Sequence, residues 1–125
     1  MTPETLLYRQ IHPSFVQNDR PTSQAFRPTP KDENKLSAYD GDKIQSQASW
    51  EHYTSKLGLA SLGVMAITNA VCTVQSLIVA ADGTPFPEHC SIDFSGLTKE
   101  PDIKKAAKNL QASAIQRGWQ FRSTQ

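Results

Sequence analysis

A polar segment over residues 12–47 constrains the fold of this chain more than any other part of it. The segment carries four prolines, five Lys or Arg and five Asp or Glu, with few apolar residues between them. Three aromatic residues, Phe15, Phe26 and Tyr39, can pin it to a core. Long ordered loops in small domains are usually functional. We therefore expect an ordered N-terminal loop that lies over the core and carries the site.

The size and composition of the chain predict one ordinary domain. Its 125 residues suffice for a single domain over residues 1–125, and no internal repeat or linker divides them. Apolar residues make up 38% and charged residues 20%, which is typical of a packed core. The net charge of +1 does not indicate nucleic acid or an acidic membrane as a partner.

Residues 57–81 form a run of 25 residues without a charge, long enough to cross a bilayer as a helix. The run contains two glycines and many β-branched residues, which favour strands over a helix. We therefore expect buried strands here and no membrane span.

The two cysteines, Cys72 and Cys90, have neither CxxC nor zinc-ligand spacing. The first twenty residues lack the apolar core of a signal peptide, so a reducing cytoplasmic compartment is expected. We predict two buried thiols, no disulfide, no metal and no cofactor.

Sequence periodicity predicts the elements. Strands are expected over residues 6–11, 63–68, 71–79, 90–95 and 119–122, with a short strand near 35–39. Helices are expected over residues 46–57 and 99–116, capped by Ser46 and Thr98 and ended by Gly58 and Gly118. This order predicts an α+β fold with a single mixed sheet, two packed helices and the long ordered N-terminal loop.

Arg9 is a charged residue within a largely apolar strand, and a buried charge must find a partner. The guanidinium is a planar fork that suits a carboxylate or a phosphate. If the loop folds back over the first strand, five side chains could converge on an anionic ligand: Arg9, His12, Arg20, Ser23 and Arg27. In the alternative, Arg9 fastens the loop by pairing with a carboxylate of Asp19, Asp32 or Asp40.

Two further groups of residues carry possible chemistry. The acids around Asp40-Gly41-Asp42, with Asp32 and Glu33, lack the spacing of an EF-hand, so a solvated turn is expected. A histidine beside carboxylates can act as an acid or a base, as His89 could with Glu88 or Asp93, or together with His52. Cys90 follows His89 directly, and neighbours on a strand point to opposite faces, so we expect no catalytic pair there.

Several common catalytic motifs are absent from the sequence, so a standard nucleotide-hydrolysing or hydrolase site is not expected. It has no glycine-rich phosphate loop, no GxSxG elbow, no HExxH and no zinc knuckle. No aromatic-basic stripe recommends RNA binding.

The segments YRQIHPSF, SQAFRPT, LSAYDG and PFPEH resemble small uncharacterised bacterial proteins over most of the chain length. This resemblance implies a bacterial origin and no particular function. The chain also resembles ADP-ribosyltransferase-like domains, in which a first strand bears an Arg or His for a nicotinamide dinucleotide and a Ser follows. Arg9 and Ser23 would fill those roles. Such enzymes usually need a late glutamate on a strand, and after Glu51 this chain has only Glu88 and Glu100.

Two functions follow as hypotheses. In the first, the chain is a binding module without enzymatic activity that recognises a small anionic ligand or a protein partner through residues 12–47. In the alternative, it transfers ADP-ribose from a dinucleotide that Arg9 holds.

Overall fold

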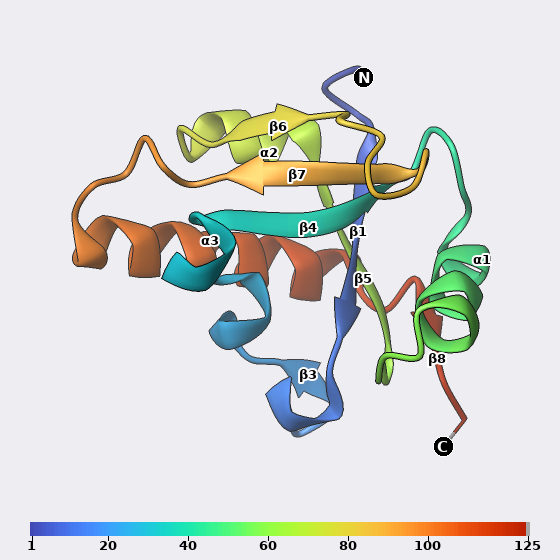
Figure 1. Cartoon of the computed structure of the whole chain (residues 1–125). Coiled ribbons are helices and arrows are strands. Elements are labelled where there is room, and N and C mark those ends of the chain that lie inside the picture. Colours follow the sequence, from blue (N-terminus) through green and yellow to red (C-terminus); the bar gives the residue numbers. More distant parts are fainter. Residues whose placement is uncertain (125) are drawn as a thin grey trace.

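A computed structural model describes residues 1–124, apart from the side chain of Pro30, and shows a twisted sheet with helices on both faces (Figure 1). The strands are β1 (Leu6–Ile11), β2 (Val16–Gln17), β3 (Arg20–Pro21), β4 (Lys35–Asp40), β5 (Gly63–Thr68), β6 (Ile78–Ala80), β7 (His89–Asp93) and β8 (Phe121–Arg122). The α-helices are α1 (Ser46–Glu51), α2 (Asn69–Val74) and α3 (Glu100–Arg117), and a π-helical turn, η4 (His52–Lys56), extends α1. Short 3₁₀ helices are η1 (Pro13–Phe15), η2 (Ser23–Phe26) and η3 (Pro30–Asp32).

Six strands form the main sheet in the order β6-β7-β4-β1-β5-β8, and β2 pairs with β3 in a separate hairpin. The predicted α+β class is confirmed. All the strand pairings of the main sheet are antiparallel, so the prediction of a mixed sheet is corrected. Neighbouring strands such as β6 and β7 pair directly, and no parallel crossover is needed.

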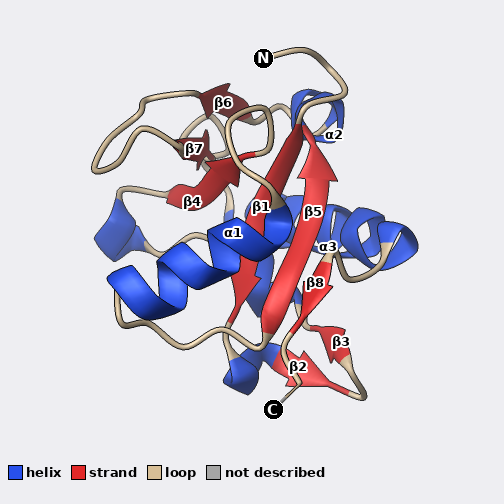
Figure 2. Cartoon of the chain, turned by 90° about the vertical axis from the view of Figure 1, so that its right-hand side faces the viewer, coloured by secondary structure: helices blue, strands red, loops and turns tan. Residues whose placement is uncertain are grey.

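The two faces of the main sheet carry separate apolar clusters. Along β1, Leu7 and Ile11 pack in the cluster that contains Leu110 of α3, while Tyr8 packs in the cluster that contains Trp50 of α1. This split follows from the alternation of side chains along a strand. Figure 2 shows α1 crossing in front of β1 and β5, with α3 behind them.

β1 and β4 separate after a short stretch of pairing. The register joins Leu7 with Asp40 and Tyr8 with Tyr39, whereas β1 pairs with β5 over its whole length. Figure 1 shows β4 and β7 lying across the direction of β1 and β5. The sheet therefore forks beyond Tyr8, and the backbone of β1 no longer pairs with that of β4 there.

The expected loop over residues 12–47 is divided into short elements. It contains the β2–β3 hairpin, three 3₁₀ helices and β4, which is an inner strand of the main sheet. The hairpin turn is Asn18-Asp19, with φ of 55° and 61°. Two such residues suit the type I′ turn that matches strand twist. The segment is ordered, but it is not one loop, because its apolar residues from Leu36 to Tyr39 complete the sheet.

Residues 71–79 were predicted to be one strand, and this prediction is wrong. The segment continues α2, turns at Ser76 with φ of 63°, and only then enters β6. Thr68 caps α2 by accepting a hydrogen bond from Val71 N at 3.2 Å. The β-branched residues of this segment favour a strand, but this preference is weak, and burial of Cys72 in the core outweighs it.

The predicted helix ends are partly right. Gly58 and Gly118 follow their helices at φ of 67° and 87°, as expected. The predicted caps are wrong: Gln45, one residue before Ser46, and Lys99, one residue after Thr98, occupy the cap positions without side-chain hydrogen bonds. Ser46 instead donates to the carbonyl of Gln120 at 3.1 Å, which ties α1 to the chain before β8.

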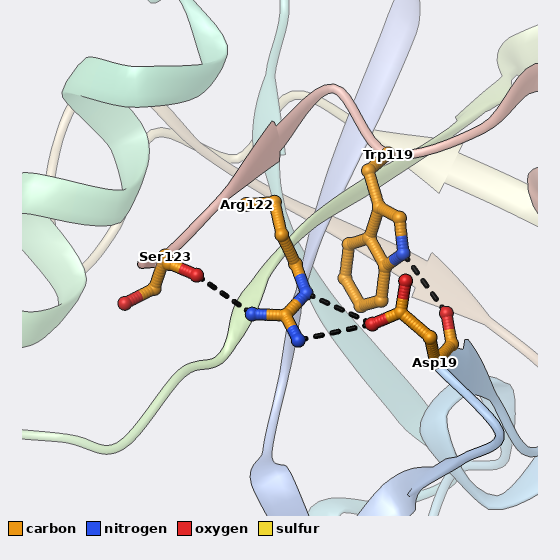
Figure 3. Close-up of polar contacts among 4 residues, drawn as sticks. All are labelled: Asp19, Trp119, Arg122 and Ser123. Carbon is orange, nitrogen blue, oxygen red and sulfur yellow. Dashed lines mark hydrogen bonds and ion pairs between the residues drawn. The ribbon is translucent and has the colours of Figure 1, made fainter. Parts of the chain in front are cut away.

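Figure 3 shows Trp119 and Arg122 in contact with Asp19 in the turn between β2 and β3. Trp119 donates its indole N–H to Asp19 O at 3.0 Å, and Arg122 donates to Asp19 Oδ1 at 2.9 and 3.2 Å. Arg122 also donates to Ser123 O at 2.7 Å and lies over the Trp119 ring. Exposed ion pairs contribute little free energy. The contact therefore fixes the position of the hairpin more than it stabilises the fold.

Both cysteines are buried and free. Burial raises the pKa of Cys72 and of Cys90 to about 12. They are unreactive thiols of the core, because the thiolate is the nucleophilic form. Within residues 1–124, no helix has the length and apolar character that crossing a membrane requires, and the uncharged run is shared among β5, α2 and β6.

Leu110 is fully buried beneath the sheet, so Leu110→Ala should lower the free energy of unfolding by about 2–5 kcal/mol through lost burial and a cavity. Lys108, exposed on the same helix, is the control, and Lys108→Ala should change it by less than about 0.5 kcal/mol. Urea denaturation measures both. Equal effects would contradict the placement of α3 against the core.

Candidate functional site

A cavity of about 450 Å³ opens where β1 and β4 separate, and we call it the fork pocket. Two strands, the π-helical turn and the loop before β7 contribute its walls. The residues that matter for its chemistry are Arg9, Asp32, Ser37, Tyr39, Tyr53, Phe86 and His89. The pocket joins a cation, a hydroxyl, an imidazole and aromatic rings at one place.

Arg9 bridges the fork with its guanidinium. Its Nε and Nη2 donate to Ala25 O of η2 at 3.0 and 2.7 Å, and its Nη1 donates to Ser37 O of β4 at 2.6 Å. These bonds replace the ladder that β1 and β4 do not form beyond Tyr8. Burial lowers the pKa of Arg9 to about 10, so the side chain remains charged at neutral pH.

Arg9 forms no direct ion pair with a carboxylate among residues 1–124, but Asp32 lines the same pocket and its charge acts to raise the pKa of Arg9. Of the acids predicted to pair with Arg9, Asp32 attracts it without a direct ion pair, and Arg9 fastens the segment through backbone carbonyls. Asp19 pairs with Arg122, Asp32 accepts from Thr29 Oγ1 at 2.8 Å, and Asp40 accepts from Asp42 N at 2.9 Å. Carbonyl oxygens accept hydrogen bonds from three of its N–H groups, and Asp32 supplies a negative charge in the same pocket.

Ser37, His89 and Asp82 form a chain of hydrogen bonds at one side of the pocket. Ser37 Oγ lies 3.1 Å from His89 Nε2, and His89 Nδ1 lies 2.7 Å from Asp82 Oδ1. An ionised carboxylate can only accept, so Nδ1 carries a proton. In the neutral imidazole Nε2 is then the acceptor, and the Ser37 hydroxyl donates to it.

The strand register brings these residues together. Ser37 lies opposite Ser91, and Tyr39 lies opposite His89, so all four side chains share the face that α3 does not cover. Their neighbours Ala38, Cys90 and Ile92 point into the other core. His89 and Cys90 thus face opposite ways, as expected.

Aromatic rings enclose the imidazole of His89. Phe86 meets His89 edge-on at 5.3 Å between centroids and stacks on Tyr39 at 5.1 Å. The Tyr39 hydroxyl lies 2.7 Å from His52 Nδ1. Burial, with Tyr53 and Glu88 nearby, raises the pKa of Tyr39 above its ordinary value. Tyr39 is therefore neutral at physiological pH, and this wall of the pocket is uncharged.

Asp82 has an environment that favours its ionised form. Burial acts to raise its pKa, but hydrogen bonds from His89 and Ser91 and from the Thr84 backbone outweigh burial. The pKa of Asp82 therefore lies below its ordinary value. The carboxylate stays charged and holds the tautomer of His89.

The five residues predicted to bind a ligand do not come together. Arg9 lines the fork pocket, whereas Arg20 and Ser23 line a separate hollow beside α3. Arg27 forms an ion pair with Glu100, and exposed His12 accepts from Ser14 N at the start of η1. The five side chains therefore do not converge on one ligand, contrary to the prediction.

The sequence identified His89 as a possible acid or base but suggested the wrong partners for it. Asp93 accepts from Ser95 N at 2.8 Å, and His52 meets Tyr39. Ser37 and Asp82 were not predicted. One signal existed for Ser37, a polar residue that alternates with Leu36 and Ala38, but nothing in the sequence paired it with residues near position 89.

The acidic turn shows no metal site. Asp42 accepts a hydrogen bond from Thr5 Oγ1 at 2.7 Å, and the Asp42 backbone N–H donates to Asp40 Oδ1. Both carboxylates are therefore engaged in hydrogen bonds at the turn. In the described part of the chain, no three His, Cys, Asp or Glu side chains are placed to hold a metal ion.

Comparisons with protein-family models, with curated proteins and with solved structures found no match to this chain.

The lowered pKa of Asp82 gives a pH prediction. A depressed folded-state pKa stabilises the protein above the unfolded value of about 3.9, and this contribution is lost as pH falls through the folded value. The difference in free energy of unfolding between the natural chain and Asp82→Asn should therefore be largest near neutral pH and shrink below about pH 4. Urea denaturation over a pH series measures it. A difference that does not change with pH would contradict the assignment.

Proposed function

We propose that this chain is a binding module whose fork pocket takes a small molecule that bears a carboxylate or a phosphate. The observation that carries the proposal is Arg9, a charged side chain that lines the pocket and forms no direct ion pair among residues 1–124, although Asp32 lines the same pocket and attracts it. A partly buried cation without a direct ion pair is costly, and an anion bonded to the guanidinium would offset that cost against the repulsion of Asp32.

Arg9 retains hydrogen-bonding capacity for such a ligand. A guanidinium has five N–H groups, and three of them serve the carbonyls of Ala25 and Ser37. The two others are available to an anion, and charge-assisted bonds of this kind are strong. Because Ala25 and Ser37 hold the guanidinium in place, little side-chain entropy is lost on binding.

The aromatic wall supports a ligand with a flat or apolar portion. Phe86 and Tyr39 stack on one another, and Tyr53 lines the pocket beside them. Pockets for small molecules commonly join apolar walls to a few well-placed polar groups. The combination favours a small aromatic or aliphatic anion over an inorganic ion.

The sequence predicted binding through residues 12–47, whereas the fork pocket is also lined by residues before and after that segment. Residues 12–47 contribute through η2 and β4, which supply the carbonyls that hold Arg9. A protein partner remains the other proposed occupant of that surface. We also propose a bacterial cytoplasmic protein, for which the two free, buried thiols give support, since reducing compartments keep thiols free.

The ADP-ribosyltransferase alternative has less support. Among the described residues that line the fork pocket, Arg9 is present, but Ser23 and the two late glutamates, Glu88 and Glu100, are not. Incubation with labelled nicotinamide dinucleotide tests this alternative, and unmodified dinucleotide at high protein concentration would eliminate it.

Phenyl phosphate and benzoate should raise the melting temperature of the protein and bind measurably by calorimetry, whereas the neutral benzyl alcohol should not. Arg9→Lys keeps the charge but loses the planar fork, so it should weaken phenyl phosphate binding by about 10-fold or more. Arg20→Ala, which alters an exposed arginine of another hollow, is the matched control and should bind normally.

Melting curves without ligand check that the Arg9→Lys protein is folded. The proposal fails if no anion binds the natural chain, or if the Arg9→Lys protein binds as tightly as the Arg20→Ala protein.

A further inference from the structure

We propose that Ser37 is a nucleophile and that the fork pocket hydrolyses small carboxylic esters, with His89 as the general base and Asp82 as the residue that positions His89. This activity goes beyond ligand binding. It uses the same cavity but does not depend on an anionic group in the substrate.

The geometry meets the requirements for an activated serine. The nucleophile and its base lie 3.1 Å apart, and the base lies 2.7 Å from the carboxylate that orients it. Both distances are within hydrogen-bond reach, which is the structural signature of such a triad on any fold. The three residues come from β4, the start of β7 and the loop between β6 and β7, so the sheet register fixes two of them.

Burial is distributed as a nucleophilic site requires. Ser37 is exposed, so a substrate can reach its hydroxyl, while the side chain of His89 is only 11% exposed and that of Asp82 32% exposed. The imidazole is fixed by Asp82 on one side and by the edge-on Phe86 ring on another. A held imidazole loses little freedom when it accepts a proton.

The fork also provides donors for the negative charge that develops on the carbonyl oxygen. Arg9 Nη1 donates to the carbonyl of Ser37 at 2.6 Å, so the guanidinium lies beside the nucleophile's own backbone with two N–H groups to spare. Backbone direction alternates along β4, and Gly41 N donates to Leu6 O on the β1 side. By the same alternation the Ser37 N–H points into the fork, where β1 has moved away.

The reaction balances with water as the second reactant. Ser37 Oγ bonds to the ester carbonyl carbon while its proton moves to His89 Nε2. The tetrahedral intermediate breaks its bond to the alcohol oxygen, which takes the proton from His89 and leaves. Water then attacks the acyl-serine and gives its proton to His89. Collapse releases the carboxylic acid and returns the proton to Ser37.

The test uses two neutral probes with the full chain: phenylmethylsulfonyl fluoride and p-nitrophenyl acetate. The sulfonyl fluoride should add one sulfonyl group to Ser37, with loss of fluoride and the serine proton, as read by intact mass and peptide mapping. Ser37→Ala should abolish the adduct, and His89→Gln should slow its formation by at least about 100-fold. Ser55→Ala, which removes an exposed serine on η4, is the control and should label like the natural chain.

Release of p-nitrophenol from the acetate should follow the same order among the four proteins. Melting curves identify any variant that fails to fold, and Asp82→Asn offers a milder change in place of His89→Gln. The proposal is overturned if the folded natural chain gains no adduct, or if the adduct forms at the same rate without His89. If the hydrogen bonds among Ser37, His89 and Asp82 serve only the fold, that outcome is expected, together with a lower melting temperature for the His89→Gln protein. Because neither probe is anionic, failure here leaves anion binding by Arg9 standing, and the converse also holds.

Discussion

The rest of the site depends on the hydrogen bonds that the Arg9 guanidinium makes across the fork. Beyond Tyr8, β1 no longer pairs with β4, and Arg9 spans the gap by donating to Ser37 O and Ala25 O. A backbone ladder there would close the fork and leave no cavity. The Arg9 side chain reaches Ser37 O of β4 over a greater distance and keeps the fork open. It also places a positive charge in the wall of a pocket of about 450 Å³.

That single bridge organises the other parts of the site. It holds η2 against the sheet and fixes the backbone of Ser37, whose hydroxyl meets His89. On the other side of the pocket, Phe86 packs on both Tyr39 and His89, so the loop before β7 closes over the imidazole. Charge, nucleophile and apolar wall therefore come from segments far apart in the sequence, and the register of β4 with β7 brings them together.

Local patterns in the sequence predicted much of the fold. The period of two around Cys90 and Ile92 identified β7, and the stripe through Leu110 identified α3, because each pattern reports one buried face. α2 was missed because its β-branched residues resemble a strand until the packing of Cys72 is known. Arg9 could be found because a charge in an apolar strand needs a partner. Ser37 and Asp82 could not, because 52 residues separate Ser37 from His89 and only pairing across strands joins them.

The most direct test of the central claim is the response of the arginine side-chain ¹H–¹⁵N signals to phenyl phosphate in solution. If Arg9 holds the fork open without a direct ion pair and can accept an anion, its Nη signals should shift and saturate. Its Nε signal, bonded to Ala25 O, should move less, and the signals of Arg20 and Arg27 should stay in place. Unchanged Arg9 signals, or equal shifts of all arginines without saturation, would contradict the account.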